Sequence, residues 1–546
     1  MKSIAFSKIE VQGELAYRSI INFARLEGKW YRPDEVFTAD QHGWPGDWEG
    51  RLILALTLLG QSTHRCPAYL DKIISMLPKY LNEKGYFGKI LHEGMVNEQQ
   101  IAGHSWFLRG LAELYTWKKD EKLLGYINAL IDNLLLKTKG VYARYPLTND
   151  ERFNCDIWEL SQPQSKNKTH AHTIDTGCAF IMLDGASYVY ELFKTPALKE
   201  LVEEMIDRFV KIDLAEVKMQ THATLTATRG ILRFYKTTGS KKYLEIAEGI
   251  FNFYKSNAWT ENYSNYNWFG DPRWTEPCAI IDSFIVATWL WQYTQNPEYL
   301  EDAHHIYYNA ICHGQRTQGE FGTDNCVGVK EPFIYPFTYE VYWCCSMRAG
   351  ECFAKAIEFN YFLEGDTVFV PFYNDSIAKL DFEDGSCVIR QCSEYPYGSN
   401  NKFKIEESDI KTAKTFKFFV PSWINEKGLY VKLSNKEVAS NIKNGFAEVV
   451  AKPEVGEIIE VNFAQKFYKR KLLNQNHIKG YCSFRHGPLI LAVSTDEEIF
   501  FNGSCDFEYT DTATYKNKAS GVFLTPLNDI KNLTGKESKK QILFRD

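Results

Sequence analysis

The chain has 546 residues and a formal net charge of −6, from 63 Lys and Arg residues against 69 Asp and Glu residues. This length exceeds what one hydrophobic core usually supports, so the sequence predicts two or three domains. The acidic balance, without a dense basic block, argues against nucleic acid or an anionic membrane as a partner, and no apolar run is long enough to span a bilayer.

Residues 1–8 include no apolar run of signal-peptide length, so we expect a cytoplasmic protein. The 13 cysteines are an odd number with irregular spacing, which in a reducing compartment indicates free thiols or metal ligands in preference to disulfides. Aromatic residues make up 15% of the chain, and their flat amphipathic surfaces suit carbohydrate ligands. We therefore expect a small carbohydrate as the partner, and the sequence leaves a homodimer open.

Hydrophobic periodicity predicts twelve helices in the first 360 residues. They cover residues 14–27, 46–61, 67–83, 98–117, 121–136, 172–194, 196–211, 220–238, 241–256, 278–294, 297–313 and 345–360. Every second helix begins with polar residues and then turns strongly apolar, whereas the others keep a solvated face. Six helical hairpins in a ring would place the apolar set inside, with all N-termini at one end. The sequence thus predicts an (α/α)6 barrel catalytic domain over residues 1–360.

Short alternating runs replace the helical pattern after residue 361, as in residues 367–371 and 415–421. Gly, Asn and Asp residues punctuate these runs, which is typical of an all-β region. We expect one or two β-sandwich modules over residues 361–546, and residues 3–11 are predicted to add an N-terminal strand to them. The expected fold class is therefore α + β and multidomain.

Six inner N-termini would bring distant polar residues into one cavity. They carry Asp47, Trp48 and Glu49, residues 98–104, residues 170–175, His222, residues 276–278, and Cys344 with Cys345. Free N–H groups and the positive end of the helix dipole favour thiolates, carboxylates and the oxygen atoms of a sugar. Position and chemistry therefore agree on a polar site at this end of the barrel.

Glu276, Cys278, Cys344 and Cys345 offer one carboxylate and three thiolates, which is a complete first shell for a zinc ion. Coordination would keep the thiols deprotonated at neutral pH. Adjacent cysteines in an aromatic stretch are often buried packing residues, and a purely structural zinc is the simpler metal hypothesis. Because both clusters fall at inner-helix N-termini, the sequence favours a zinc site in the cavity.

These residues carry a resemblance to the β-L-arabinofuranosidases of glycoside hydrolase family 127. The matching motifs are Glu276-x-Cys278 with Cys344-Cys345, Ala102-Gly-His104, His222-Ala223, residues 479–490 and residues 523–529. The likeness covers nearly the whole chain. It is weakest over residues 44–51, and Ser346-Met-Arg348 replaces the Pro-Pro-Asn common in the family.

The resemblance implies a retaining glycosidase in which a zinc-bound cysteine replaces the usual carboxylate nucleophile. Carried onto this chain, Cys344 would attack the anomeric carbon and form a thioglycosyl intermediate, while Glu276, Cys278 and Cys345 hold the metal beside it. The implied substrate is a terminal β-L-arabinofuranoside or a related plant-derived furanoside.

A general acid/base must also protonate the leaving oxygen and later activate water. The family has a glutamate sixteen residues before the metal-binding glutamate, but position 260 here is threonine. We assign the role to Glu261, with one residue missing from the intervening loop. Asp271 is the competing candidate, although an Asp before Pro usually marks a turn.

Three histidines lie near inner-helix starts, and the resemblance implies that His104, His172 and His222 contact the sugar. Imidazole both donates to and accepts from hydroxyl groups, which suits this role, although a lone histidine is more often structural. Asp47, Trp48 and Gln100 are further candidates for substrate binding.

Two other functions use the same expected fold. One is an (α/α)6-barrel uronyl hydrolase or sugar epimerase that works with carboxylates and histidines, with zinc absent or structural. The other is a carbohydrate-binding protein without turnover. Metal content and the effect of replacing Cys344 would separate these functions from a cysteine glycosidase.

Overall fold

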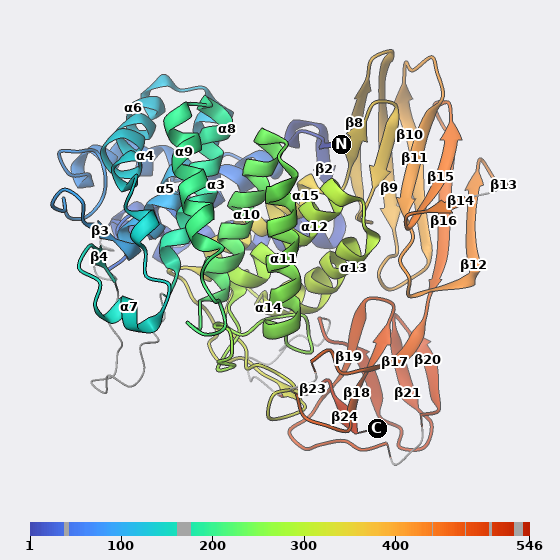
Figure 1. Ribbon diagram of the computed structural model, residues 1–546. Coiled ribbons are helices and arrows are strands. Elements are labelled where there is room, and N and C mark those ends of the chain that lie inside the picture. The colour runs from blue at the N-terminus through green and yellow to red at the C-terminus, as the bar shows by residue number, and fades with distance from the viewer. Residues whose placement is uncertain are drawn as a thin grey trace.

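Helices form the first two thirds of the molecule and strands the last third, as Figure 1 shows. This computed structural model describes residues 1–37, 43–160, 176–438, 441–474, 477–501, 505–528 and 539–545. The strands lie in two groups on one side of the helical region, one group above the other in this view. The α + β, multidomain fold class is therefore confirmed.

Six helices are buried along nearly their whole length. They are α3 (Asp47–Ser62), α5 (Glu98–Lys118), α8 (Met182–Phe193), α10 (Thr221–Thr238), α12 (Pro277–Thr294) and α15 (Cys345–Glu358). Each contacts the next, in the order α3, α5, α8, α10, α12 and α15, and α15 returns to α3. These helices therefore close into a ring, and they belong to the apolar set of the sequence pattern.

Six further helices alternate with the ring helices along the chain and pack against them. They are α1 (Gly13–Leu26), α4 (Leu70–Tyr80), α6 (Glu121–Leu130), α9 (Pro196–Phe209), α11 (Lys241–Ala258) and α13 (Pro297–Ile306). The short helices α2 (Pro33–Val36), α7 (Asn149–Phe153) and α14 (Cys312–Gly314) lie in connections. None of the described helices is long and apolar enough to cross a membrane.

A glycine allows the closest approach within the ring. A Cβ atom at Gly50 of α3 would lie 2.1 Å from the backbone nitrogen of Phe107 on α5, so any side chain there would force the two helices apart.

Three large sheets form the strand region. The first has the order β1 (Lys2–Ser3), β6 (Phe362–Glu364), β7 (Thr367–Val370), β11 (Lys414–Phe419), β15 (Phe446–Ala451), β14 (Asn441–Lys443). The second has the order β13 (Lys436–Val438), β12 (Ile424–Leu433), β16 (Ile458–Gln465), β10 (Asn400–Ser408), β9 (Gly385–Ser393), β8 (Ser376–Phe382), β2 (Ile9–Val11). The third has the order β17 (Phe467–Lys471), β18 (Tyr481–His486), β19 (Leu489–Ser494), β22 (Phe523–Pro526), β21 (Thr514–Asn517), β20 (Phe507–Asp511).

Strand pairing joins the helical and strand regions at several points. The N-terminal strands β1 and β2 pair antiparallel with β6 and β8, in two different sheets. Strand β5 (Phe333–Ile334), from the loop before α15, pairs with β23 (Lys540–Gln541), and β24 (Phe544–Arg545) pairs with β18. Within the helical region, β3 (Val96–Asn97), directly before α5 in the chain, pairs in parallel with β4 (Trp158–Glu159). The regions are thus held together by main-chain hydrogen bonds as well as by packing.

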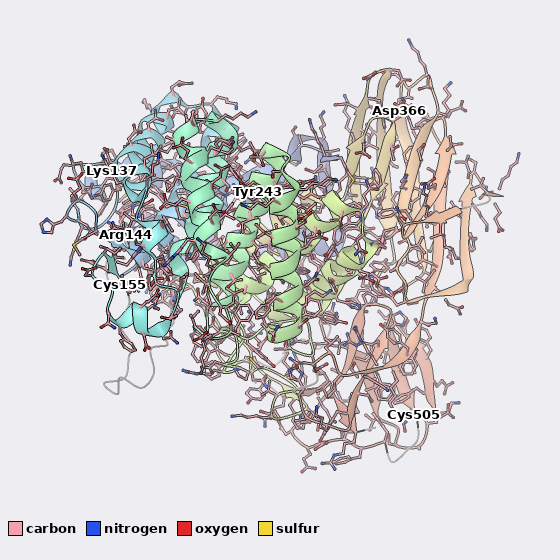
Figure 2. The ribbon with its side chains drawn as sticks, in the orientation of Figure 1. Lys137, Arg144, Cys155, Tyr243, Asp366 and Cys505 are labelled. Carbon is pink, nitrogen blue, oxygen red and sulfur yellow. The ribbon has the colours of Figure 1, made fainter. Side chains whose placement is uncertain are left out.

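All 13 cysteines are free thiols, which fits the expectation from their spacing. Figure 2 shows Cys155 and Cys505 on opposite sides of the molecule, one in the helical region and one in the third sheet. No disulfide therefore contributes to the stability of this chain.

Charged side chains fill part of the interior of the helix ring. Four arginines and three carboxylates interact there, namely Arg109, Arg229, Arg233 and Arg348 with Asp184, Asp282 and Glu351. Arg229 lies 2.6 Å from Asp282, and both side chains are fully buried. Burial by itself would raise the pKa of Asp282, but Arg348 and Arg229 hold it below its usual value. The network therefore stays ionised inside the core.

We predict that Asp282→Ala lowers the free energy of unfolding by about 3–5 kcal/mol, because it leaves buried arginines without their partner. Denaturant unfolding followed by helical circular dichroism measures this change. Glu200→Ala removes the exposed ion pair between Lys139 and Glu200 and is the control, which should unfold like the wild type. An Asp282→Ala protein as stable as this control would contradict the assigned role of the network.

Candidate active site

Three cysteines and one glutamate meet at the start of two ring helices. Glu276 precedes α12 and Cys278 lies in its first turn, after Pro277 at the first helical position, where proline is well tolerated. Cys344 precedes α15 and Cys345 is its first residue. One ligand atom from each of the four residues lies within 4.8 Å of the others. Two segments far apart in the sequence therefore form one compact cluster.

The donor set fits a tetrahedral zinc ion. With a Zn–S bond of about 2.3 Å, two sulfur ligands should lie about 3.8 Å apart, and a sulfur and an oxygen about 3.5 Å apart. The Sγ atoms of Cys278 and Cys345 are 3.8 Å apart, and Cys345 Sγ is 3.6 Å from Glu276 Oε1. The Cys278 and Cys344 sulfurs lie closer, at 3.0 Å. The chain thus holds its donors at nearly the spacing that the metal needs.

The electrostatic environment of the cluster also favours the binding of a cation. Hydrogen bonds from Cys278 and Cys345 hold the pKa of Cys344 well below its usual value, whereas burial raises the pKa values of Cys278 and Cys345. Burial and the neighbouring Cys344 raise the pKa of Glu276 to about 7. Four acidic groups at this spacing cannot all be ionised unless a positive charge neutralises them. A divalent metal would supply that charge.

Arg51 of α3 lies beside the cluster and links it to the cavity. Its Nη1 is 3.7 Å from Cys278 Sγ, and its Nε is 2.8 Å from Asp47 Oδ2. The guanidinium group lies 4.5 Å from the ring centre of Trp106, which also stacks on His222 at 5.8 Å. These contacts fix the side chains that surround the cysteines.

A cavity of about 470 Å3 opens next to the cluster. Its walls include Trp44, Asp47, Trp48, Arg51, Ile181, Gln220, His222, Asn267, Trp274, Glu276, Thr323, Phe337, Thr338, Val341, Trp343 and Cys344. Cys344 is the only one of the three cluster cysteines in this wall, since Cys278 and Cys345 are buried behind it. Phe337 and Trp343 are 55% and 44% exposed, so aromatic rings also line the part of the cavity nearest to solvent.

Polar atoms in the cavity wall lack partners. Asp47 Oδ1 and Asn267 Oδ1 are buried and accept no hydrogen bond within the described parts of the chain, and His222 Nε2 forms none, although it lies 3.6 Å from Asp282 Oδ2. Buried polar groups are nearly always satisfied, so unpaired ones that face a cavity indicate a polar ligand. Burial lowers the pKa of His222 to about 3, and its ring is therefore neutral at pH 7 and able both to donate and to accept.

Of the predicted substrate contacts, Asp47, Trp48 and His222 line this cavity. His172 lies outside the described residues. His104 and Gln100 do not line the cavity, and backbone groups bind both side chains. His104 Nδ1 is 2.7 Å from Gln100 O and its Nε2 accepts from Phe87 N–H at 2.9 Å, while Gln100 Nε2 donates to Phe87 O and Lys89 O. Both side chains hold the segment before α5 and do not face the cavity.

Glu261, the predicted acid/base, is not in the cavity wall. Its side chain is fully buried and accepts hydrogen bonds from the backbone N–H groups of Leu473 and Asn474, at 2.9–3.2 Å. Its Oε1 also lies 2.5 Å from Nδ1 of His477. The carboxylate therefore anchors the segment that leads into β18, and the role that sequence spacing predicts for it stays a prediction.

Asp271, the competing candidate, does not reach the cavity either. It forms an ion pair with Arg273 two residues later, at 2.7 Å. The proline that follows it is consistent with a turn.

Sequence reasoning missed several residues of this wall, including Arg51, Gln220, Asn267 and Trp274. One signal was available for Arg51, because an arginine on a predicted apolar inner helix, four residues after Asp47, must have a buried partner. The other three lie in loops or helix caps, where periodicity gives no information on direction.

Neither a protein-family model nor any curated protein sequence matches this chain. Solved structures do match its fold. A β-arabinofuranosidase of glycoside hydrolase family 127 superposes with a TM-score of 0.72 at 14% sequence identity, over 100% of this chain and 97% of its own. This chain has the fold of that enzyme.

Two further solved structures have the same fold as this chain. A glycoside hydrolase gives a TM-score of 0.68 at 13% identity, over 100% of this chain and 97% of its own. A family 127 β-L-arabinofuranosidase from Geobacillus stearothermophilus T6 gives 0.65 at 12% identity, over 97% and 93%. The resemblance that the sequence motifs carried is therefore confirmed at the level of the fold, across the full length of both chains.

We predict that the purified protein holds about one zinc ion per chain and that Cys345→Ala loses it. Cys352→Ala is the matched control, because Cys352 is a buried thiol on the same helix and lies outside the cluster. Metal analysis after dialysis measures the content. Because protons compete for thiolate ligands, metal retention should fall as the pH is lowered. Equal zinc in Cys345→Ala and the wild type would exclude the cluster as the site.

For Glu261→Gln we expect lower stability, by about 1–3 kcal/mol, because a buried acceptor of backbone N–H groups is weakened. Catalysis by the protein that remains folded should change only a few-fold. Thermal unfolding and initial rates on the same samples test this. A stable variant that has lost turnover would restore Glu261 as the acid/base.

Proposed function

We propose that this protein is a retaining glycoside hydrolase and that its active site is the cavity beside the Glu276, Cys278, Cys344 and Cys345 cluster. In this proposal the six helical hairpins form an (α/α)6 barrel, with the site at the N-terminal end of its inner helices. One observation carries the proposal: a metal-type cluster presents a single sulfur, that of Cys344, to a cavity with aromatic walls and unpaired polar atoms. The fold of family 127 supports the reaction class.

Accessibility separates the roles of the cysteines. Cys278 and Cys345 are 0% and 1% exposed and do not line the cavity, so a substrate cannot reach them. Bound zinc would keep the thiol groups of the cluster ionised at neutral pH. Cys344 is then the nucleophile, and Glu276, Cys278 and Cys345 are the anchoring ligands.

The reaction proceeds by two displacements. In the first, the Cys344 sulfur bonds to the anomeric carbon, the bond from that carbon to the aglycone oxygen breaks, and this oxygen takes a proton from an acid in the cavity. In the second, water gives a proton back to the same group, its oxygen attacks the anomeric carbon, and the carbon–sulfur bond breaks. The sugar leaves with its configuration retained, and Cys344 returns to its starting state.

Asp47 is the carboxyl group best placed to supply the proton. It lies in the cavity wall with Cys344, and apart from the cluster residue Glu276 no other carboxylate of the described residues lines that wall. Arg51 holds Oδ2, which leaves Oδ1 without a partner. Burial raises the pKa of Asp47 to about 6, although Arg51 opposes the shift. A carboxylic acid with such a pKa can act as acid and then as base near neutral pH.

The remaining wall is suited to one terminal sugar ring. His222 and Asn267 would bond to hydroxyl groups, and Trp48 and Trp274 would cover the faces of the ring. We take the substrate to be a terminal β-L-arabinofuranoside or a related furanoside from plant glycans.

Cys344→Ala should abolish turnover of an aryl β-L-arabinofuranoside, because it removes the sulfur that forms the covalent intermediate in this proposal. Helical circular dichroism checks that the fold is kept. An activity screen over aryl furanosides and pyranosides, with and without zinc chelation, defines the sugar. Turnover that survives both chelation and Cys344→Ala would favour carboxylate or histidine chemistry instead.

Asp47→Asn should lower the turnover of natural disaccharides by about 10²–10⁴-fold, the usual contribution of a general acid/base. An aryl substrate with a good leaving group should lose less. The wild-type rate should fall above about pH 6, as Asp47 loses its proton. The rate of the variant should not show this fall. Asp271→Asn removes a carboxylate outside the cavity and is the control. Identical pH profiles for Asp47→Asn and the wild type would rule out the role.

A further inference from the structure

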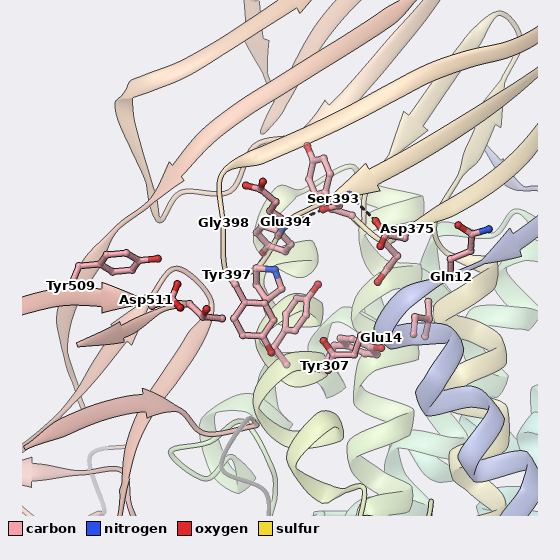
Figure 3. Close-up of a pocket in the computed structure, with 17 residues that line it drawn as sticks. Gln12, Glu14, Tyr307, Asp375, Ser393, Glu394, Tyr397, Gly398, Tyr509 and Asp511 are labelled. Carbon is pink, nitrogen blue, oxygen red and sulfur yellow. Dashed lines mark hydrogen bonds between the residues drawn. The ribbon is translucent and has the colours of Figure 1, made fainter. Parts of the chain in front are cut away.

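A second cavity, of about 440 Å3, lies where five segments of the chain meet. Its walls come from the start of α1, the π-helical turn Tyr307–Ile311 that follows α13, residues 373–375 before β8, the loop between β9 and β10, and the hairpin of β20 and β21. Figure 3 shows Tyr509 and Asp511 on the hairpin side and Gln12 and Glu14 on the opposite side. It shares no lining residue with the active-site cavity.

The floor of this junction cavity is made of tyrosines. Tyr307 and Tyr308 are 5% and 4% exposed, and both line the cavity. Their rings contact each other at 5.2 Å, and Tyr308 packs on Tyr395 at 5.7 Å. A tyrosine hydroxyl group in a cavity wall can both donate a hydrogen bond to a polar ligand and accept one from it. The π-helical turn that presents them is a rare element that often occurs at functional sites.

One aromatic ring stands at the edge of the junction cavity and is largely accessible. Tyr509 of β20 is 52% exposed; its ring packs edge-on against Tyr515, at 5.5 Å, and lies 6.4 Å from the His486 ring in a stacked arrangement. Tyr397, from the loop after β9, is half-buried nearby and accepts a hydrogen bond from Asn528 through its hydroxyl oxygen. Flat rings with polar edges suit the faces of sugar rings.

Four carboxylates complete the walls, namely Glu14, Asp375, Glu394 and Asp511. They do not form a metal site, because among the described residues only the Glu276 cluster brings three or more ligand atoms within 4.8 Å of one another. Asp375 accepts from Ser393 N–H at 2.8 Å, and Glu14 pairs with Arg18. Dispersed carboxylates that keep free lone pairs are acceptors for several hydroxyl groups of a neutral ligand. The negative charges of these carboxylates would repel an acidic ligand.

The junction cavity continues into a neighbouring one of about 370 Å3, with which it shares Glu14, Tyr397 and Thr512. In this second chamber, Asn528 Oδ1 is buried and accepts no hydrogen bond within the part of the chain that the structure describes, and His313 Nε2 forms none but lies 3.7 Å from Asp324 Oδ2. Both side chains are 7% exposed. Polar contacts therefore extend over an elongated space, which suits a chain of sugar units better than a single ring.

We propose that the junction cavity is a second carbohydrate-binding site, which holds a neutral oligosaccharide stretch of a glycan away from the point of cleavage. The choice of carbohydrate rests partly on the proposed function, whereas the site itself rests on its own residues. Because it draws on α1, the second sheet and the third sheet together, the site also gives the strand region a direct part in substrate binding.

Affinity electrophoresis of the full chain in gels that contain arabinan, arabinoxylan or polygalacturonate tests this proposal. We expect at least one of the two neutral polymers to retard the wild type and the acidic polymer to have no effect. Tyr509→Ala should weaken the retarding interaction about tenfold, because it removes the accessible stacking face. Phe523→Ala is the matched control, since Phe523 is a 47% exposed aromatic residue of the same sheet that lies outside the cavity.

Two results would overturn the proposal: no retardation by either neutral polymer, or equal retardation of Tyr509→Ala and the wild type. Asp511→Asn, which changes one exposed acceptor and no packed ring, should show a smaller loss of the same sign. Hydrolysis of aryl furanosides by Tyr509→Ala should equal that of the wild type. Failure of the proposed function would instead appear as wild-type protein that cleaves no aryl glycoside, a readout that is independent of retardation.

Discussion

The buried ion network inside the helix ring is the constraint on which the site depends. Its charged groups come from α5, α8, α10, α12 and α15, so each pair fixes the rotation of one ring helix against another. Apolar packing alone tolerates small rotations, but a buried ion pair is strongly destabilised when its partner is displaced. The N-terminal ends of α12 and α15 are therefore held in register, and this register brings Cys278, Cys344 and Cys345 together.

The network also reaches the cavity directly. Asp282 lies 3.6 Å from His222 Nε2 and pairs with Arg348, three residues after Cys345 on α15. Arg348 and Arg51 both contact the ring of Trp106, at 4.3 and 4.5 Å. Positive charge therefore surrounds a cluster of acidic ligands, and stacked rings hold it there. Such a preorganised environment is what a thiolate nucleophile needs, because it supports the anionic sulfur without giving it a proton.

The two cavities differ in a way that suits different tasks. The active-site cavity has its reactive groups at helix starts, on rigid elements, and few of its wall residues are exposed. The junction cavity is built from loops, a π-helical turn and a hairpin, with an exposed ring at its edge. Chemistry requires fixed atoms, whereas binding of a flexible polymer tolerates a more open surface. If both proposals hold, this division gives the strand region a role in binding next to the helices that carry the reactive groups.

The alternation of helices, the change to strands after residue 361 and the four cluster residues could all be predicted from the sequence, because periodicity and ligand chemistry are local properties. The sequence did not determine where loop side chains point. Glu261 lies one position from the expected spacing, yet the tight turn that pairs Trp259 with Asn265 directs it towards the backbone N–H groups of residues 473 and 474. His104 likewise accepts a hydrogen bond from the backbone N–H of Phe87. These contacts become visible only in the folded chain, since the partners that satisfy a buried polar group can lie far away in the sequence.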